Sequence, residues 1–108
     1  MAFAVLLTDD AAQDLREIFH FIAHHDAPEK ADYVLGQLEK TLLSLVESPE
    51  RGTFPKELLN LGIRDYREIY FKPYRILYRV FDQKVFVLLI ADGRRDMQAL
   101  LQRRLLEA

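Results

Sequence analysis

The hydrophobic pattern of this chain changes from a helical period to a strand period in its second half, and that change most limits the folds that the chain can form. Up to residue 48, apolar residues recur every three or four positions, as on one face of a helix. From Arg67 to Ile90 they alternate with polar residues, as in strands that are buried on one face. A helical half followed by a strand half predicts an α+β fold.

The helical half begins with a short apolar run, Phe3 to Leu7, whose length favours a buried strand. We expect a helix next, capped by Asp10 with Gln13 completing a capping box. A second start signal lies at Asp26, with Pro28 in the first helical turn, and this helix is expected to run to Ser48-Pro49. Two amphipathic helices with a short connection predict an antiparallel hairpin.

In the strand half, Lys72-Pro73 and Asp82-Gln83 break the alternation into three strands, after an irregular segment 49–63 with one helical turn near 57–59. The residues expected to share a face are Arg67, Ile69 and Phe71 in the first strand, Tyr74, Ile76, Tyr78 and Val80 in the second, and Phe86, Leu88 and Ile90 in the third. Of these, Tyr74, Ile76 and Tyr78 are expected to pack against the helices. After Gly93 the pattern is helical again. The predicted fold is an N-terminal strand, an antiparallel helix hairpin packed on an antiparallel β-meander, and a C-terminal helix. We expect the helices to cover one sheet face, in a single domain of residues 1–108.

The 108 residues contain no cysteine, which excludes disulfides, thiolate metal sites and cysteine nucleophiles. The apolar run at Ala2 to Leu7 is too short for a signal peptide or a membrane span. We therefore expect a cytoplasmic protein with no membrane partner.

Charge is distributed unevenly along the chain. Residues 1–63 carry five Lys or Arg against eleven Asp or Glu, and residues 64–108 carry ten against six. The basic half could face an anionic partner, or the two halves could attract one another across the fold.

Three histidines, His20, His24 and His25, include a pair four residues apart, a spacing that can hold a metal from one helix face. No third ligand has a suitable spacing, so we interpret these side chains as solvated. No metal and no cofactor is expected.

The arginines are the stronger candidates for a binding site. Arg94 and Arg95 follow Gly93 at a strand-to-helix junction, where a missing side chain would let an anion approach closely. One of the two is expected to pair with Asp92 or Asp96 instead. Further cationic candidates are Arg75, on the strand face away from the helices, and Arg103 and Arg104 in the C-terminal helix.

Taken in order, several segments resemble the RelE/ParE superfamily of toxins from type II toxin-antitoxin modules. These are Ala12, Asp14 and Leu15; Pro28-Glu29-Lys30-Ala31; Pro49 with Gly52; Arg67-Glu68; Tyr74-Arg75-Ile76-Leu77-Tyr78-Arg79-Val80; and Gly93-Arg94-Arg95-Asp96. The resemblance covers nearly the whole chain. It implies one of two activities, cleavage of messenger RNA in the RelE branch or poisoning of DNA gyrase in the ParE branch.

The RNA-cleaving branch uses lysines on the strand before the Tyr-Arg motif and a C-terminal tyrosine. Arg75 and Arg95 match that branch, whereas Tyr66, Glu68 and Tyr70 stand in place of the lysines and Leu101 in place of the tyrosine. Gly-Arg-Arg-Asp before a helix is similar to the ParE branch, although Asp92 replaces the histidine of many relatives. The resemblance therefore implies a ParE-like toxin that is not an enzyme and has no catalytic residues. An endoribonuclease and a non-toxic antitoxin-binding protein remain as alternatives.

The partners that the resemblance implies are a cognate, ParD-like antitoxin in a hetero-oligomer and DNA gyrase, with indirect contact with DNA. The expected target-binding residues are Arg75, Arg94, Arg95, Arg103 and Arg104. The expected antitoxin-binding residues are Phe21, Arg94, Arg95, Leu101 and Arg104. Phe21 lies off the main apolar stripe, so it is either exposed to a partner or placed at the edge of the core.

Overall fold

The computed structural model describes residues 2–106, so the predicted domain 1–108 is covered except for Met1, Glu107 and Ala108, which lie outside the described residues. Its elements in chain order are β1 (Ala4–Leu7), α1 (Asp9–His25), α2 (Pro28–Leu43), α3 (Lys56–Leu59), β2 (Arg67–Phe71), β3 (Tyr74–Phe81), β4 (Lys84–Asp92) and α4 (Met97–Leu106). This order confirms the predicted α+β fold. Among the described residues, no helix is long and apolar enough to cross a membrane.

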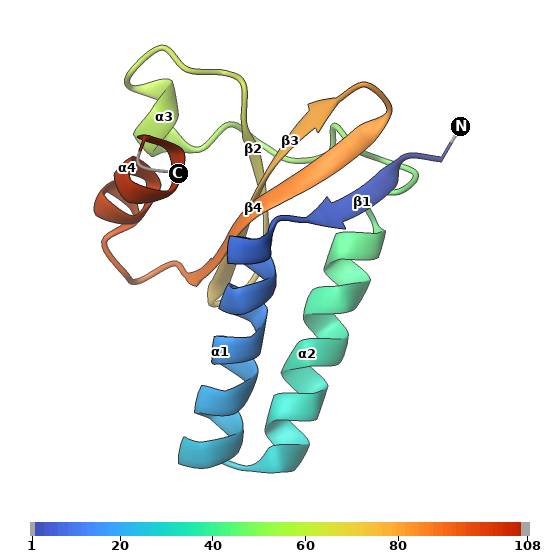
Figure 1. Cartoon of the computed structure of the whole chain (residues 1–108), viewed down its shortest axis with the longest axis vertical. Helices are drawn as coiled ribbons and strands as arrows, with labels where there is room; N and C mark the ends of the chain where they lie inside the picture. Colours follow the sequence, from blue (N-terminus) through green and yellow to red (C-terminus); the bar gives the residue numbers. More distant parts are fainter. Residues whose placement is uncertain (1, 107–108) are drawn as a thin grey trace.

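The four strands form one sheet in the order β1-β4-β3-β2 (Figure 1). β2, β3 and β4 pair antiparallel, as the predicted meander requires, and β1 pairs parallel with β4. The β3–β4 turn has positive φ at Asp82 (52°) and Gln83 (66°), as tight hairpin turns do.

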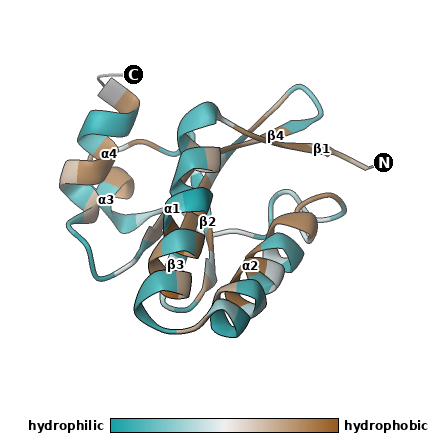
Figure 2. Cartoon of the chain, turned by 60° about the horizontal axis from the view of Figure 1, so that its bottom comes forward, coloured by the Kyte–Doolittle hydropathy of each residue, from teal (hydrophilic) through white to brown (hydrophobic). Residues whose placement is uncertain are grey.

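The α1–α2 hairpin covers one face of this sheet. The main buried cluster lies between them and includes Leu38, Leu45, Ile76, Tyr78 and Val85. In Figure 2, hydrophilic and hydrophobic residues alternate along α1 and α2, as expected of amphipathic helices, whereas strands β1 and β4 are mostly hydrophobic. The predicted packing of Tyr74, Ile76 and Tyr78 toward the helices is confirmed.

The prediction that all helices cover the same face is wrong. A second buried cluster joins α3 and α4 to the opposite face through Leu58, Leu77, Leu89, Met97 and Leu101. Leu77 lies between Ile76 and Tyr78 in β3, so its side chain points away from the α1–α2 hairpin. The sheet is therefore covered on both faces, on the second face only in part.

β4 contains a β-bulge, which changes the side-chain alternation predicted for this strand. Leu77 pairs with Leu89 while Tyr78 pairs with Val87, which leaves Leu88 without a partner in β3. One extra residue shifts the alternation by one position. Val85, Val87 and Ile90 are consequently buried against the α1–α2 hairpin, and the prediction that Phe86, Leu88 and Ile90 share one face is wrong.

The predicted helix starts are also corrected. Thr8, not Asp10, caps α1, because its extended backbone lets Oγ1 accept the Ala11 N–H at 3.1 Å. Asp26 ends α1 and binds the Lys30 ammonium at 2.8 Å, so it does not cap α2.

The second helix ends earlier than expected, at Leu43. Tight turns over residues 44–47 replace the predicted helical continuation. They bring the Val46 carbonyl to the Phe3 N–H at 2.9 Å and still bury Leu45 completely. The turns thus tie the end of α2 to the start of β1.

Candidate functional site

A cleft of about 840 Å³ opens between the helix hairpin and the end of the sheet. In Figure 1, α1 and α2 extend well below the sheet, and residues of this extension line one wall of the cleft. The β2–β3 turn, the end of β4 and the loop before α4 form the other wall. Its lining residues include Ile18, Phe21, Ile22, Tyr33, Val34, Phe71, Lys72, Tyr74, Ile90, Arg94 and Arg95, together with the carboxylates Asp14, Glu17, Asp26 and Asp92.

Phe21 is an exposed apolar residue at this cleft. Its side chain is 62% exposed, and its ring stacks on His25 with centroids 4.3 Å apart. The alternative that it reaches the core edge is therefore wrong. Of its two sequence interpretations, exposure toward a partner is the one compatible with the structure.

Arg94 and Arg95 lie at the opposite rim. Arg94 donates to both carboxylate oxygens of Asp92, at 2.9 and 2.6 Å, which lowers the pKa of Asp92. This confirms that one arginine of the pair binds a neighbouring aspartate. Asp96 instead caps α4, accepting the Ala99 N–H at 3.1 Å. Arg95 is exposed and makes no ion pair with any residue in the described part of the chain.

Gly93 serves internal packing instead of anion binding. A Cβ at this position would lie 3.0 Å from the Arg75 Cδ and 3.2 Å from the Pro73 carbonyl oxygen. The Gly93 N–H donates to that carbonyl at 2.8 Å. The prediction that an anion approaches the backbone here is wrong, because the space is already filled.

Arg75 lies on the other face of the sheet and is 7% exposed. Its Nε donates to Glu68 at 2.7 Å, and its two Nη atoms donate to Glu57 at 2.9 and 2.8 Å. The Tyr70 hydroxyl completes the group by donating to Glu68 at 2.9 Å. The hydrogen bonds between Glu57 and Arg75 lower the pKa of the Glu57 carboxyl and raise the pKa of the Arg75 guanidinium. The guanidinium is occupied within the fold, as is the Glu68 carboxylate.

Arg104 is held in a similar way. It donates to both Asp14 oxygens at 2.8 and 3.0 Å and to the Leu88 carbonyl at 2.7 Å. Asp14 also accepts the Ile90 N–H at 2.9 Å. This network ties α4 to α1 and to the bulge of β4.

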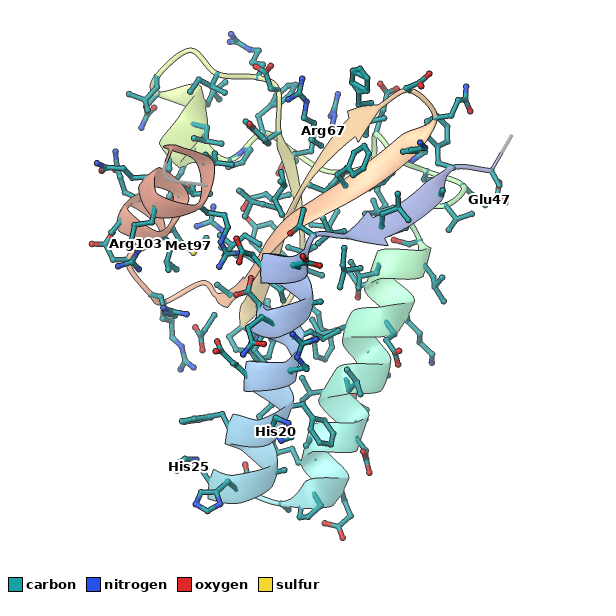
Figure 3. All side chains as sticks on the ribbon, in the orientation of Figure 1. His20, His25, Glu47, Arg67, Met97 and Arg103 are labelled. Atoms are coloured by element: carbon teal, nitrogen blue, oxygen red, sulfur yellow. The ribbon has the colours of Figure 1, made fainter. Side chains whose placement is uncertain are left out.

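The remaining candidates in α4 differ from each other. Arg103 is exposed and points away from the sheet in Figure 3. Leu101 is 3% exposed and belongs to the second buried cluster, so the structure does not present it on the surface. It is one of the residues that line a cavity of about 380 Å³ between α3 and α4.

The histidines stay apart from any candidate ligand set. His20 and His25 lie in the lower half of α1 in Figure 3. Within residues 2–106, no three His, Cys, Asp or Glu side chains gather as metal ligands would.

The structure confirms attraction between the two halves for two arginines, whereas the anionic partner stays a prediction for the exposed ones. Arg75 and Arg104 bind carboxylates of the acidic half across the fold. Arg94, Arg95 and Arg103 remain exposed. Of the predicted site residues, the structure brings Phe21, Arg94 and Arg95 together around the cleft and places Arg75, Arg103, Arg104 and Leu101 elsewhere.

Sequence reasoning did not find the aromatic rim of the cleft. Tyr33, 61% exposed, lies edge-on to Phe71 with centroids 6.4 Å apart. The position of Tyr33 off the apolar period of α2 was the available signal. The contact itself joins a helix to a strand far along the chain and leaves no local pattern.

Comparison with known proteins identifies the family. The family model for the ParE toxin of the type II toxin-antitoxin system parDE matches residues 5–97. Toxin ParE3 of Caulobacter vibrioides is 27% identical over 100 residues, covering 93% of this chain and 96% of its own.

Solved structures share the fold. The chromosomal ParDE system of P. aeruginosa superposes with a TM-score of 0.70 at 19% identity, over 84% of this chain and 96% of that one. A mutant of the E. coli toxin RelE in the free state gives 0.63 at 23% identity, over 93% of each chain. The toxin-antitoxin complex RelBE2 of Mycobacterium tuberculosis gives 0.60 at 20% identity, over 85% and 92%.

Arg104→Gln should destabilise the fold, whereas Arg103→Gln should not. Removing the Arg104 guanidinium leaves the Asp14 carboxylate, 12% exposed, without its cation, which costs about 2 to 4 kcal/mol. The exposed Arg103 should change the free energy of unfolding by less than about 0.5 kcal/mol. Urea unfolding followed by circular dichroism measures both, and equal effects would contradict the structural role of Arg104.

Glu57→Gln should lower stability at neutral pH, by an amount that shrinks in acid. The pKa of Glu57 is depressed in the folded state, so its ion pair stabilises the protein above the ordinary glutamate pKa of about 4.3. That contribution is lost as pH falls through the folded-state pKa. Urea unfolding at a series of pH values tests this, with the exposed Glu39→Gln as control. A difference from the parent protein that does not change with pH would count against it.

Proposed function

This chain belongs to the ParE toxin family of type II toxin-antitoxin systems, and from that premise we propose that it inhibits DNA gyrase. It acts in the cytoplasm by stabilising the complex in which gyrase holds cleaved DNA, so that breaks accumulate. It does so by binding and not by catalysis.

The exposed pair Arg94–Arg95 is the observation that carries this proposal. Arg95 has its donors free among the described residues, and Arg94 is bound only to Asp92 at the surface, with its side chain 81% exposed. Two guanidinium groups at one rim can hold carboxylates or phosphates of a large target in two-pronged geometry. Contact with the DNA in the complex is indirect, through gyrase.

The surroundings of Arg75 disfavour the alternative of an endoribonuclease. A residue that stabilises a phosphorane must present free donors to it. The Arg75 donors are engaged by Glu57 and Glu68, and the face that would meet the phosphate carries these two carboxylates. Arg75 and Arg104 therefore support the binding surface from inside the fold.

The cleft is the proposed site for a segment of the cognate antitoxin, in a toxin-antitoxin hetero-oligomer. Phe21 and the aromatic rim offer apolar contact, and Arg94 and Arg95 offer charge to acidic residues of the partner. Because the same arginines would hold gyrase, the antitoxin neutralises the toxin by occupying them.

Arg94→Gln combined with Arg95→Gln should weaken the poisoning of gyrase. The variant loses charged hydrogen bonds to the target, and each one contributes about 1.5 kcal/mol or more to binding. The toxin concentration that gives the same level of cleaved DNA should therefore rise by about tenfold or more. The assay is purified gyrase with supercoiled plasmid, and the control is Lys56→Gln combined with Arg64→Gln, an equal loss of exposed charge. Full potency of the Arg94/Arg95 variant would remove the pair from the target surface. A parent protein that leaves supercoiling intact and traps no breaks would end the gyrase proposal.

Phe21→Ala should weaken antitoxin binding by about thirtyfold, because exposed aromatic anchors dominate interface energies. Leu43→Ala is the matched control, since Leu43 is 64% exposed and does not line the cleft. Titration calorimetry with the antitoxin encoded beside the toxin gene measures both affinities. Equal affinities for the two variants would place the antitoxin outside the cleft.

A further inference from the structure

The β3–β4 hairpin carries cations and aromatic rings in alternation on one face. Arg79 pairs directly with Phe86, and Phe81 pairs directly with Lys84. Residues opposite each other in an antiparallel pair lie on the same face, as do residues two apart in one strand. These four side chains, which we call the hairpin platform, therefore form a two-by-two pattern of ring and charge.

The hairpin platform points away from α1 and α2. Val80 and Val85, the pair between its two rows, pack into the main buried cluster on the α1–α2 side. On the platform's face of the sheet, α3 and α4 pack against β3 and β4 as far as Leu77 and Leu89 and not beyond them toward the turn. In Figure 1 the hairpin extends past both short helices at the upper right. Phe81 is accordingly 56% exposed.

The cations of the platform are available to a ligand. The Arg79 guanidinium lies 5.9 Å from the centre of the Phe81 ring, and within residues 2–106 neither Arg79 nor Lys84 forms an ion pair. Arg67, opposite Tyr78 in the neighbouring strand, lies on the α1–α2 side and donates to the Glu50 and Gly52 carbonyls at 3.3 and 2.8 Å, so it is not part of the platform. The only carboxylate within the hairpin turn is Asp82.

We propose that the hairpin platform binds single-stranded nucleic acid without reading its sequence. Phe81 and Phe86 stack on bases, and Arg79 and Lys84 hold the phosphates on either side. Proteins of this kind combine a cationic track with rings on which successive bases stack. This site lies apart from Arg94 and Arg95 and does not depend on the gyrase proposal.

The geometry selects a single strand over a duplex. Phe81 and Phe86 are diagonal neighbours, roughly 7 to 8 Å apart, about twice the 3.4 Å rise of a stacked strand. Bases on both rings must therefore be splayed apart, which a paired duplex prevents. A protein partner fits less well, because the centres of protein interfaces are depleted in lysine and the platform carries Lys84 between its rings.

Fluorescence anisotropy with a labelled oligothymidylate of about 12 nucleotides tests the proposal on the whole chain, from about 50 mM to 200 mM salt. Phe81→Leu keeps an apolar side chain but removes stacking, and should weaken binding by about 5- to 150-fold. Arg79→Gln combined with Lys84→Gln should reduce the slope of log affinity against log salt by about 1.4, for two phosphate contacts. The control, Lys56→Gln combined with Arg64→Gln, changes the net charge equally and should leave both quantities near the parent values.

Circular dichroism and thermal unfolding check that each variant folds. We expect that they do, because the substituted side chains are exposed. Binding that is unchanged in the platform variants would overturn the proposal, as would equal affinity for a duplex of the same length. If these variants lose antitoxin binding and keep oligonucleotide affinity, the platform is a protein-docking surface and the proposal is wrong. None of these experiments changes Arg94 or Arg95. Their outcomes are therefore independent of the outcome of the gyrase assay.

Discussion

The Asp14 carboxylate connects α1, on one face of the sheet, to α4, on the other. It accepts the Ile90 N–H, and it binds the Arg104 guanidinium, which in turn donates to the Leu88 carbonyl. Leu88 is the residue that the bulge leaves unpaired. A backbone carbonyl freed from the ladder at a half-buried site needs a donor. Arg104 supplies that donor and is neutralised by Asp14, so the bulge, α1 and α4 depend on one ion pair.

The bulge matters because it decides what each sheet face presents. On one side of it, Val85 and Val87 pack under the α1–α2 hairpin, and on the other, Ile90 does so. The shifted alternation turns Leu89 and Ala91 toward α3 and α4, while Phe86 remains on the same face beyond the cluster that α3 and α4 bury. The cleft and the hairpin platform are therefore both consequences of how far the helices extend along a four-stranded sheet.

Sequence patterns predicted the elements well because period and turn residues are local. The change from a helical to an alternating pattern located α1, α2 and the three antiparallel strands, and Lys72-Pro73 and Asp82-Gln83 located the turns. The face covered by α4 was not predictable in this way, since amphipathicity gives a helix a buried side but not the sheet face that buries it. The partners of the arginines were equally hidden. Arg94 binds a residue two positions away, which sequence reasoning anticipated, whereas Arg104 binds one 90 positions away.

Arg75 shows that the role of a charged residue, and the effect of replacing it, depend on its partners in the fold. α3 has four residues, too few for its own hydrogen bonds to hold it as a helix. Leu58 and the bidentate pair from Glu57 to Arg75 anchor it to the sheet. With one guanidinium between two carboxylates, removal of Arg75 would leave two like charges facing each other in a nearly dry site. A loss of toxicity on replacing Arg75 would then report the collapse of this anchor, whereas the same loss at exposed Arg95 would report a contact with the target.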